Sequence, residues 1–257
     1  MPVITLKQIK TLKTKKGRDD SGLFIIEGEK FVSEIPNEWK VKAYVISEEF
    51  STANASYADS LRSRAPVVVV PSRRFDSLSD TVTPQGIMAV CEKREFTLDD
   101  MLVSAPFLLI GECLADPGNI GTLIRTAAAA GASGAILSAG SGDIYNPKTV
   151  RATAGALLRL PVIEKADLNE ILPALKARGV MILAACVDDN ESILPYDLDL
   201  RRGCGMLIGN ESKGLSAEGK SMADALVKLP MAEEIESLNA SVAGAVLIYE
   251  VVRQRGI

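Results

Sequence analysis

The chain has 257 residues, with 29 lysines and arginines against 33 aspartates and glutamates, which gives a formal net charge of −4. It is long enough for two domains and is not a polycation, so contact with nucleic acid requires a local basic patch. The sequence has no histidine, which excludes Ser-His-Asp and Cys-His nucleophile pairs and every metal site that uses an imidazole.

Residues 1–95 alternate strand-like and helix-like segments. A basic helix is predicted to begin at Thr5, which stands at capping-box spacing from Gln8, and to end at Gly17. A further helix is predicted at 55–64, and strands are predicted at 23–26, 41–46, 66–71 and 86–92. This alternation predicts a small α/β domain, and the polar stretch that ends at Pro106 marks its boundary.

Residues 106–257 alternate more regularly. Helices are predicted after the loop at 116–119, at 150–160, at 168–179 and from about Ser237 onward, and continuous apolar strands are predicted at 107–113, 134–138, 180–186, 205–210 and 225–230. Such strands are typical of a parallel sheet covered on both faces. Ligands of these sheets bind at loops beyond the carboxyl ends of the strands.

The cysteines predict no metal or disulfide chemistry. They are far apart in sequence and form no Cys-x-x-Cys pair; they are Cys91, Cys113, Cys186 and Cys204. Each lies in an apolar run of strand type, so we expect buried, reduced thiols. The first residues lack the apolar core of a signal peptide, and no apolar run approaches the ~20 residues that a bilayer requires. We therefore expect a cytoplasmic protein with no membrane and no metal partner.

The first of three ligand-type loops leads into an apolar helix. Asn119 is predicted to cap a helix that begins near Ile120, and Arg125 follows within that helix. A helix N-terminus followed by an arginine suits an anion such as a phosphodiester. The alternative is an ordinary capped helix whose arginine is solvated or salt-bridged.

The second and third loops follow later strands. The sequence LIGNESKGLS imitates a phosphate loop, but Leu215 stands where a Walker motif requires lysine, so we exclude a nucleotide loop. In it, Glu211 either binds a polar group or caps the next helix. In the third loop, Ser237 is a predicted N-cap of the last helix. The acids Glu233, Glu234 and Glu236 precede it without partners at metal-ligand spacing, and we interpret them as a solvated loop.

Together the three loops are more specific than any one of them. The patterns N-x-G-x-x-x-R at 119–125, G-N-E-x-x-G-L-S at 209–216, and L-P-M at 229–231 followed by S-L-N-x-S at 237–241 resemble the signature motifs of the SpoU (SPOUT, TrmH-like) RNA ribose methyltransferases. This resemblance implies a C-terminal α/β domain with a trefoil knot over 106–257. It also implies a smaller ribosomal-protein-like α/β substrate-binding domain over 1–95.

The resemblance further implies S-adenosylmethionine as cofactor and methyl transfer to a ribose 2′-hydroxyl. The residues that it assigns to the cofactor are Ala185, Ile208, Gly209, Leu229 and Leu238. Arg125 matches the catalytic arginine of the family, with Asn119, Glu211, Ser237 and Asn239 positioning it and the ribose. A guanidinium is a poor base, so we favour binding of phosphate and stabilisation of alkoxide charge over proton removal as its main role.

The implied substrate is RNA, with 23S ribosomal RNA preferred. Phosphate contacts are expected from basic residues near the N-terminus and in the segment at 146–151: Lys7, Lys10, Lys13, Lys15, Lys16, Arg18, Lys148 and Arg151. The resemblance also implies a homodimer packed through the first-loop helix and the last helix, whose alanine-rich faces allow close approach. The alternatives are a transfer RNA ribose methyltransferase and a non-catalytic RNA-binding protein of the ribosome.

Overall fold

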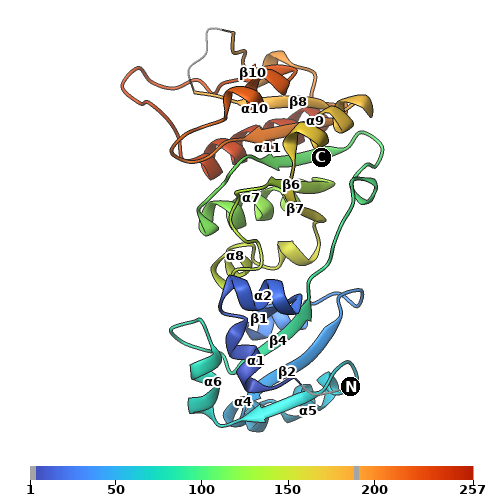
Figure 1. Cartoon of the computed structure of the whole chain (residues 1–257), viewed down its shortest axis with the longest axis vertical. Coiled ribbons are helices and arrows are strands. Elements are labelled where there is room, and N and C mark those ends of the chain that lie inside the picture. Colours follow the sequence, from blue (N-terminus) through green and yellow to red (C-terminus); the bar gives the residue numbers. More distant parts are fainter. Residues whose placement is uncertain (1–3, 188–190, 257) are drawn as a thin grey trace. The chain divides into compact units, whose positions relative to one another are not determined.

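The computed structural model describes residues 4–187 and 191–256. Contacts divide the chain into two compact units: Met1–Arg94 with Tyr145–Leu158, and Glu95–Ile144 with Arg159–Ile257. Each unit is built on its own sheet (Figure 1). No helix among the described residues is both long and apolar enough to cross a bilayer.

The first unit contains a mixed sheet of the order β1-β4-β2-β3. Its strands are β1 (Leu23–Glu27), β2 (Val41–Ser47), β3 (Val67–Val70) and β4 (Ile87–Glu92). The β2 and β3 strands are parallel, whereas β4 runs antiparallel to both β1 and β2. This arrangement confirms the predicted α/β class for the N-terminal part of the chain.

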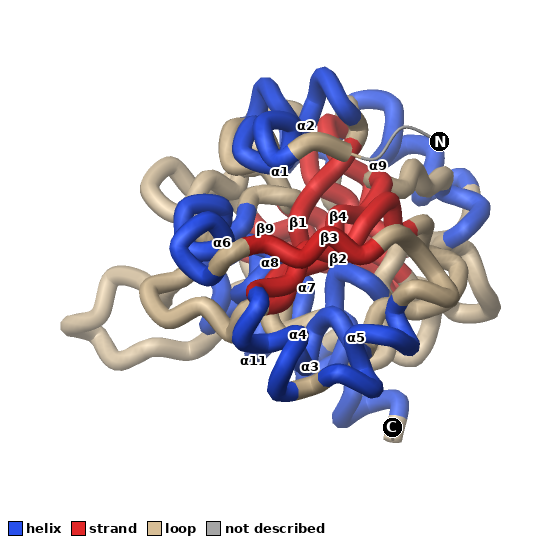
Figure 2. The backbone as a smooth tube through the Cα atoms, turned by 90° about the horizontal axis from the view of Figure 1, so that it is seen from below, coloured by secondary structure: helices blue, strands red, loops and turns tan. Residues whose placement is uncertain are grey.

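Helices lie on both sides of this sheet. Figure 2 shows α1 and α2 on one side and α3, α4 and α5 on the other. Ile9 and Leu12 pack with Phe75 against Val45 and Met88 in a buried apolar cluster. The helices of this unit are α1 (Leu6–Thr11), α2 (Lys15–Ser21), α3 (Glu29–Ser33), α4 (Glu48–Ala53), α5 (Ala55–Leu61), α6 (Ser72–Leu78) and α8 (Pro147–Ala152).

The basic N-terminal segment forms two short helices rather than the predicted single helix. The capping box of Thr5 and Gln8 is confirmed, with reciprocal bonds of 3.3 and 2.8 Å. Gly17, however, lies inside α2, and Gly22 in the left-handed region ends that helix. A Cβ at Gly17 would stand 2.1 Å from the Thr11 carbonyl oxygen. Gly17 therefore permits close crossing of α1 and α2 instead of terminating a helix.

Residues 145–158 pack with the first unit, although they follow β6 (Gly134–Ser138) in the chain. The Trp39 indole N–H donates to the Leu158 carbonyl oxygen at 2.8 Å, and the rings of Phe24 and Tyr145 lie 4.6 Å apart. The helix predicted at 150–160 is also shorter than expected. Positive φ values at Ala154 and Gly155 separate α8 from a 3₁₀ turn at Ala156–Leu158.

The second unit contains a parallel sheet of the order β10-β8-β9-β5-β6-β7. All of its pairings among the described residues are parallel, as predicted from the continuous apolar strands. The strands are β5 (Phe107–Gly111), β6 (Gly134–Ser138), β7 (Val162–Ala166), β8 (Met181–Ala185), β9 (Cys204–Ile208) and β10 (Ala225–Val227). The β5, β6 and β9 strands are buried along their whole length, which requires cover on both faces.

Helices provide that cover. The helices of this unit are α7 (Pro117–Ala129), α9 (Leu168–Ala177), α10 (Ala217–Met222) and α11 (Ala240–Arg255). Leu172 and Leu175 of α9 pack with Ile110 and Leu207 in one buried cluster. A Cβ at Gly244 of α11 would stand 2.4 Å from Leu123 of α7 and 3.7 Å from Ile208. Since adjacent strand residues point to opposite faces, α7 and α11 cover the face opposite α9.

Two sequence expectations were wrong here. The sequence predicts no strand at 162–166, but β7 forms there as an edge strand that contains Glu164 and Lys165. The cysteines are not uniformly buried: Cys113 is exposed and Cys186 half-buried. Cys91 is buried, and burial raises the pKa of its thiol to about 12.

Candidate functional site

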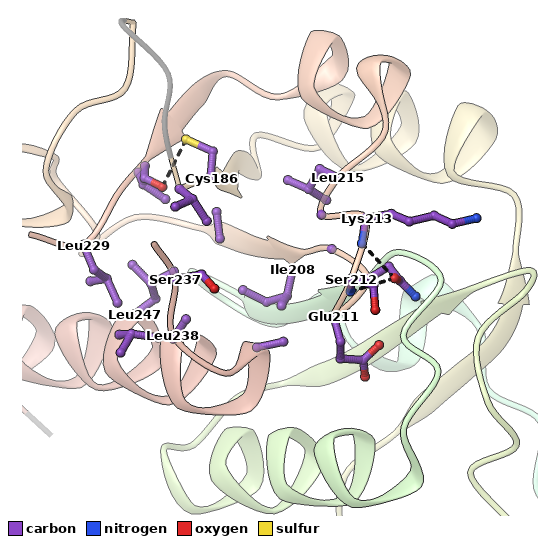
Figure 3. Close-up of a pocket in the computed structure, with 18 of the residues that line it drawn as sticks. Cys186, Ile208, Glu211, Ser212, Lys213, Leu215, Leu229, Ser237, Leu238 and Leu247 are labelled. Atoms are coloured by element: carbon purple, nitrogen blue, oxygen red, sulfur yellow. Dashed lines mark hydrogen bonds between the residues drawn. The ribbon is translucent and has the colours of Figure 1, made fainter. Parts of the chain in front are cut away.

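A cavity of about 440 Å³ lies in the second unit, beyond the carboxyl ends of β8 and β9 and beside the start of α11 (Figure 3). All five residues that the sequence assigns to the cofactor line it: Ala185, Ile208, Gly209, Leu229 and Leu238. Other lining residues include Leu215, Met231 and Leu247, which were not assigned to the cofactor from the sequence. The cavity therefore combines apolar side chains with the backbone of one tight loop.

That loop, residues 209–215, is closed by its own backbone. The N–H groups of Asn210 and Gly214 donate to each other's carbonyl oxygens at 3.1 and 2.9 Å. A Cβ at Gly209 would stand 2.4 Å from the carbonyl carbon of Gly214, and Gly214 has φ +66°. The Asn210 side chain also donates to the Cys113 carbonyl oxygen at 2.8 Å. Both glycines are thus required by the closure of the loop, whose backbone forms one wall of the cavity.

Glu211 connects this loop to the segment before α7. Its carboxylate accepts hydrogen bonds from the N–H groups of Ala115 and Asp116 and from Nδ2 of Asn119, at 3.0–3.1 Å. Burial raises the pKa of Glu211, but these hydrogen bonds outweigh it and hold the pKa below its ordinary value. Of the two roles left open by the sequence, the structure shows binding of polar groups, not capping of the next helix.

The helix after the first loop is capped by Asp116, not by Asn119 as predicted. The Asp116 carboxylate accepts from the Asn119 N–H at 2.9 Å, and Pro117 occupies the first turn. The Asp-Pro pair is a sequence signal for this start, because proline is favoured in the first turn. It frees the Asn119 side chain for other partners.

Asn119 links all three loops. Its Nδ2 donates to Glu211, and its Oδ1 accepts from Nδ2 of Asn239 at 3.1 Å. Asn239, rather than the predicted Ser237, is the N-cap of α11, since its Oδ1 accepts from the N–H groups of Ser241 and Val242. Ser237 is exposed and lines the cavity. Three of the predicted catalytic residues therefore form one hydrogen-bonded row, and a fourth lies at the cavity.

Arg125 lies apart from this row. It sits on α7 with an exposed side chain, and it is not among the residues that line the cavity. Within the described part of the chain its guanidinium makes no hydrogen bond or ion pair. It is available to an anion that approaches α7 from outside.

The predicted RNA-binding residues, all in the first unit, differ in their availability. Exposed side chains belong to Lys7, Lys10, Lys15, Lys16 and Lys148. Lys13 donates to the carbonyl oxygens of Ser77 and Ser79, and Arg151 pairs with Asp80 at 3.0 Å. The prediction that Arg18 binds RNA was wrong. Its side chain is only 1% exposed and donates to the Leu12 carbonyl oxygen at 2.7 Å. It therefore stabilises the turn between α1 and α2 and cannot present its charge to RNA.

The prediction that the acidic residues before α11 lie in a solvated loop is confirmed. Glu233, Glu234 and Glu236 are exposed. Among the described residues no group of three histidines, cysteines, aspartates or glutamates is placed to hold a metal ion.

Comparison with known proteins matches both parts of the chain. Residues 106–249 match the SpoU rRNA Methylase family, and residues 4–89 match the MRM3-like substrate binding domain. The 23S rRNA (guanosine(2553)-2′-O)-methyltransferase RlmP of Bacillus subtilis is 32% identical over 246 residues, which cover 95% of this chain and 94% of that protein. The 23S rRNA (uridine(2479)-2′-O)-methyltransferase of Streptomyces viridochromogenes is 31% identical and covers 95% of this chain and 87% of its own length.

A solved structure agrees with these matches. The SpoU methyltransferase AviRb from Streptomyces viridochromogenes, in complex with AdoMet, superposes with a TM-score of 0.88 at 28% identity and covers 97% of each chain. The predicted α/β architecture and the resemblance of the three loops are thereby confirmed. The chain belongs to the SpoU rRNA methylase family.

Proposed function

We propose that this protein transfers the methyl group of S-adenosylmethionine to a ribose 2′-hydroxyl of 23S ribosomal RNA. The observation that carries the proposal is the cavity lined by Ala185, Ile208, Gly209, Leu229 and Leu238 beside the row of Glu211, Asn119 and Asn239. The relatives named above, which align over 95% of this chain, are named for 23S ribosomal RNA. This favours ribosomal RNA over transfer RNA.

The cavity fits the cofactor in size and chemistry. A volume of about 440 Å³ lies within the range of roughly 300–1,000 Å³ that is usual for ligand pockets. Ile208, Leu229, Leu238 and Leu247 supply apolar walls, while the loop at 209–215 supplies backbone polar groups. When bound, S-adenosylmethionine supplies a methyl group activated by a sulfonium centre. The apolar walls give the reacting atoms surroundings of lower dielectric than bulk water, which strengthens electrostatic interactions there.

The residues of the chain divide the remaining work. Glu211 and Asn239 hold Asn119 from two sides, so its amide is fixed beside the first turn of α7. Arg125 binds the phosphate next to the target nucleotide and stabilises negative charge on the ribose oxygen. A guanidinium keeps its proton at physiological pH, so this role suits Arg125 better than proton removal. The exposed lysines of the predicted RNA-binding set bind the RNA backbone; they are Lys7, Lys10, Lys15, Lys16 and Lys148.

We also propose a homodimer that uses the outer face of the last helix, α11. The α7 and α11 helices contact each other within one chain, with Gly244 packed on Leu123. The outer face of α11 instead presents Val242, Val246 and Tyr249, which are 49%, 48% and 51% exposed. Apolar residues at this spacing form one helix stripe of the kind that marks an interface. In such a dimer we expect the Arg125 of the second copy to face this chain's cavity, because the Arg125 of this chain does not line it. The trefoil knot remains a prediction from the family resemblance.

Methyl transfer to purified ribosomal RNA tests the function. The protein is incubated with S-adenosylmethionine carrying a labelled methyl group and with 23S ribosomal RNA or transfer RNA, and ribose methylation is mapped by resistance to alkaline cleavage. We expect one new 2′-O-methylated position in 23S ribosomal RNA. Label found only in transfer RNA would overturn the assignment of 23S ribosomal RNA as the substrate. Cofactor titration without any binding would instead indicate the non-catalytic RNA-binding protein.

A further inference from the structure

The geometry points to Glu112, which lies outside the three signature motifs, as a positioning residue for the cofactor loop at 209–215. Glu112 directly follows β5, and its own N–H donates to the Ile208 carbonyl oxygen at 2.8 Å. It thus sits beside the strand that leads into the loop at 209–215. The inference rests on the proposed function, because the loop that Glu112 holds is the one assigned to S-adenosylmethionine.

The Glu112 carboxylate holds the far end of that loop. Its two oxygens accept from the N–H and the hydroxyl of Ser216 at 2.8 and 2.6 Å. Ser216 is in turn the N-cap of α10, since its hydroxyl oxygen accepts from the Gly219 N–H at 2.9 Å. Hydrogen bonds to a charged acceptor are stronger than neutral ones. Glu112 therefore fixes both the residue that directly follows the loop and the first turn of α10.

Gly219 leaves room for this carboxylate. A Cβ at position 219 would stand 2.9 Å from each carboxylate oxygen of Glu112. Any larger residue there would push the carboxylate away from Ser216. The glycine and the glutamate thus depend on each other, although they are far apart in sequence.

Glu112 and Glu211 form a reciprocal pair of carboxylates between the same two segments. Glu112 belongs to the segment after β5 and holds Ser216 after the cofactor loop. Glu211 belongs to the cofactor loop and holds Ala115 and Asp116 after β5. The two carboxylates fix different parts of the site. Glu211 is hydrogen-bonded to Asn119 of α7. Glu112 holds Ser216, which directly follows the cavity-lining residues Gly214 and Leu215.

This division predicts how the kinetic constants separate. Loss of the Glu112 carboxylate loosens the cavity wall without touching the row of Glu211, Asn119 and Asn239. The Kd and KM for S-adenosylmethionine are expected to rise about tenfold, in line with the loss of two charge-assisted hydrogen bonds at a partly solvated site. The kcat at saturating cofactor is expected to change less than about threefold, because the transition-state contacts are retained.

The experiment compares Glu112→Ala, Glu112→Gln and Gly219→Ala in the full-length protein. Cofactor Kd is measured by calorimetry, KM and kcat by methyl transfer, and folding by thermal melting. Glu218→Gln on the same helix is the control, because Glu218 is exposed and its carboxylate makes no hydrogen bond or ion pair within the described residues. Glu112→Gln, which keeps one acceptor oxygen, is expected to show an intermediate loss.

The double variant Glu112→Ala/Gly219→Ala separates this role from general destabilisation. Gly219→Ala alone is expected to weaken cofactor binding, whereas it adds almost nothing once the Glu112 carboxylate is absent. Folded variants with the Kd of the unsubstituted protein, or a fall in kcat at unchanged Kd, would overturn the inference and leave the proposed function intact. Failure of the unsubstituted protein to bind the cofactor would overturn the proposed function itself.

Discussion

Replacement of Glu211 by glutamine removes a charged acceptor that has three donors. Glutamine keeps one oxygen and turns an NH₂ group toward the other donor, so at least one N–H of Ala115 or Asp116 loses its acceptor. A hydrogen bond to a charged group contributes roughly 1.5–3 kcal/mol when buried. Glu211 is only half-buried and water replaces part of the loss. We therefore expect a destabilisation of about 1–2 kcal/mol.

Urea unfolding followed by fluorescence or circular dichroism measures this loss, with Glu236→Gln in the exposed third loop as control. The pH dependence provides a second check. Because the folded-state pKa of Glu211 is lowered, its contribution is present at neutral pH and disappears as pH falls through the acidic range where the carboxylate takes up a proton. The difference in unfolding free energy between the unsubstituted protein and Glu211→Gln should become smaller at acidic pH. Equal stability of the two proteins at pH 7 would refute the reasoning.

Three further predictions concern the cofactor, the RNA and the dimer. Arg125→Ala is expected to abolish methyl transfer with less than about a twofold change in cofactor Kd, because Arg125 does not line the cavity; normal turnover in the assay would remove Arg125 from the mechanism. Alanine at four exposed lysines is expected to weaken RNA binding and to reduce the slope of log K against log salt by about 0.7 for each phosphate that is no longer neutralised, as measured by filter binding; the four are Lys7, Lys10, Lys15 and Lys16. Val246→Glu is expected to convert a dimer to a 27.4 kDa monomer in sedimentation, and an unchanged dimer would place the interface elsewhere.

Local patterns could be predicted from the sequence where neighbouring residues determine the outcome. The capping box of Thr5 and Gln8 and the buried parallel strands are such cases, because each depends on residues a few positions apart. The β7 strand escaped prediction because an edge strand needs little apolar surface, and Glu164 and Lys165 interrupt its pattern. The burial of Arg18 also escaped, since it depends on how α2 crosses α1.

The residues of the candidate site could be predicted from the sequence, but the hydrogen bonds between them could not. The motif resemblance assigned Asn119, Glu211 and Asn239 to one site. The hydrogen bonds that connect them could not be predicted, because they depend on β5 and β9 being neighbours in the sheet. Sequence spacing carries no such information, because the partners lie 92 and 120 positions apart. The same reason explains why Glu112 was overlooked: its partner Ser216 is 104 positions away.

The packing of residues 145–158 with the first unit has a consequence for synthesis of the protein. Nascent domains generally fold as they leave the ribosome, from the N-terminus onward. Here the first 94 residues lack part of their own unit until residues 145–158 have emerged. Until then the indole of Trp39, only 2% exposed in the finished fold, has no Leu158 carbonyl oxygen to accept its hydrogen bond. Completion of the first unit is therefore delayed until β5 and β6 of the other unit have been translated.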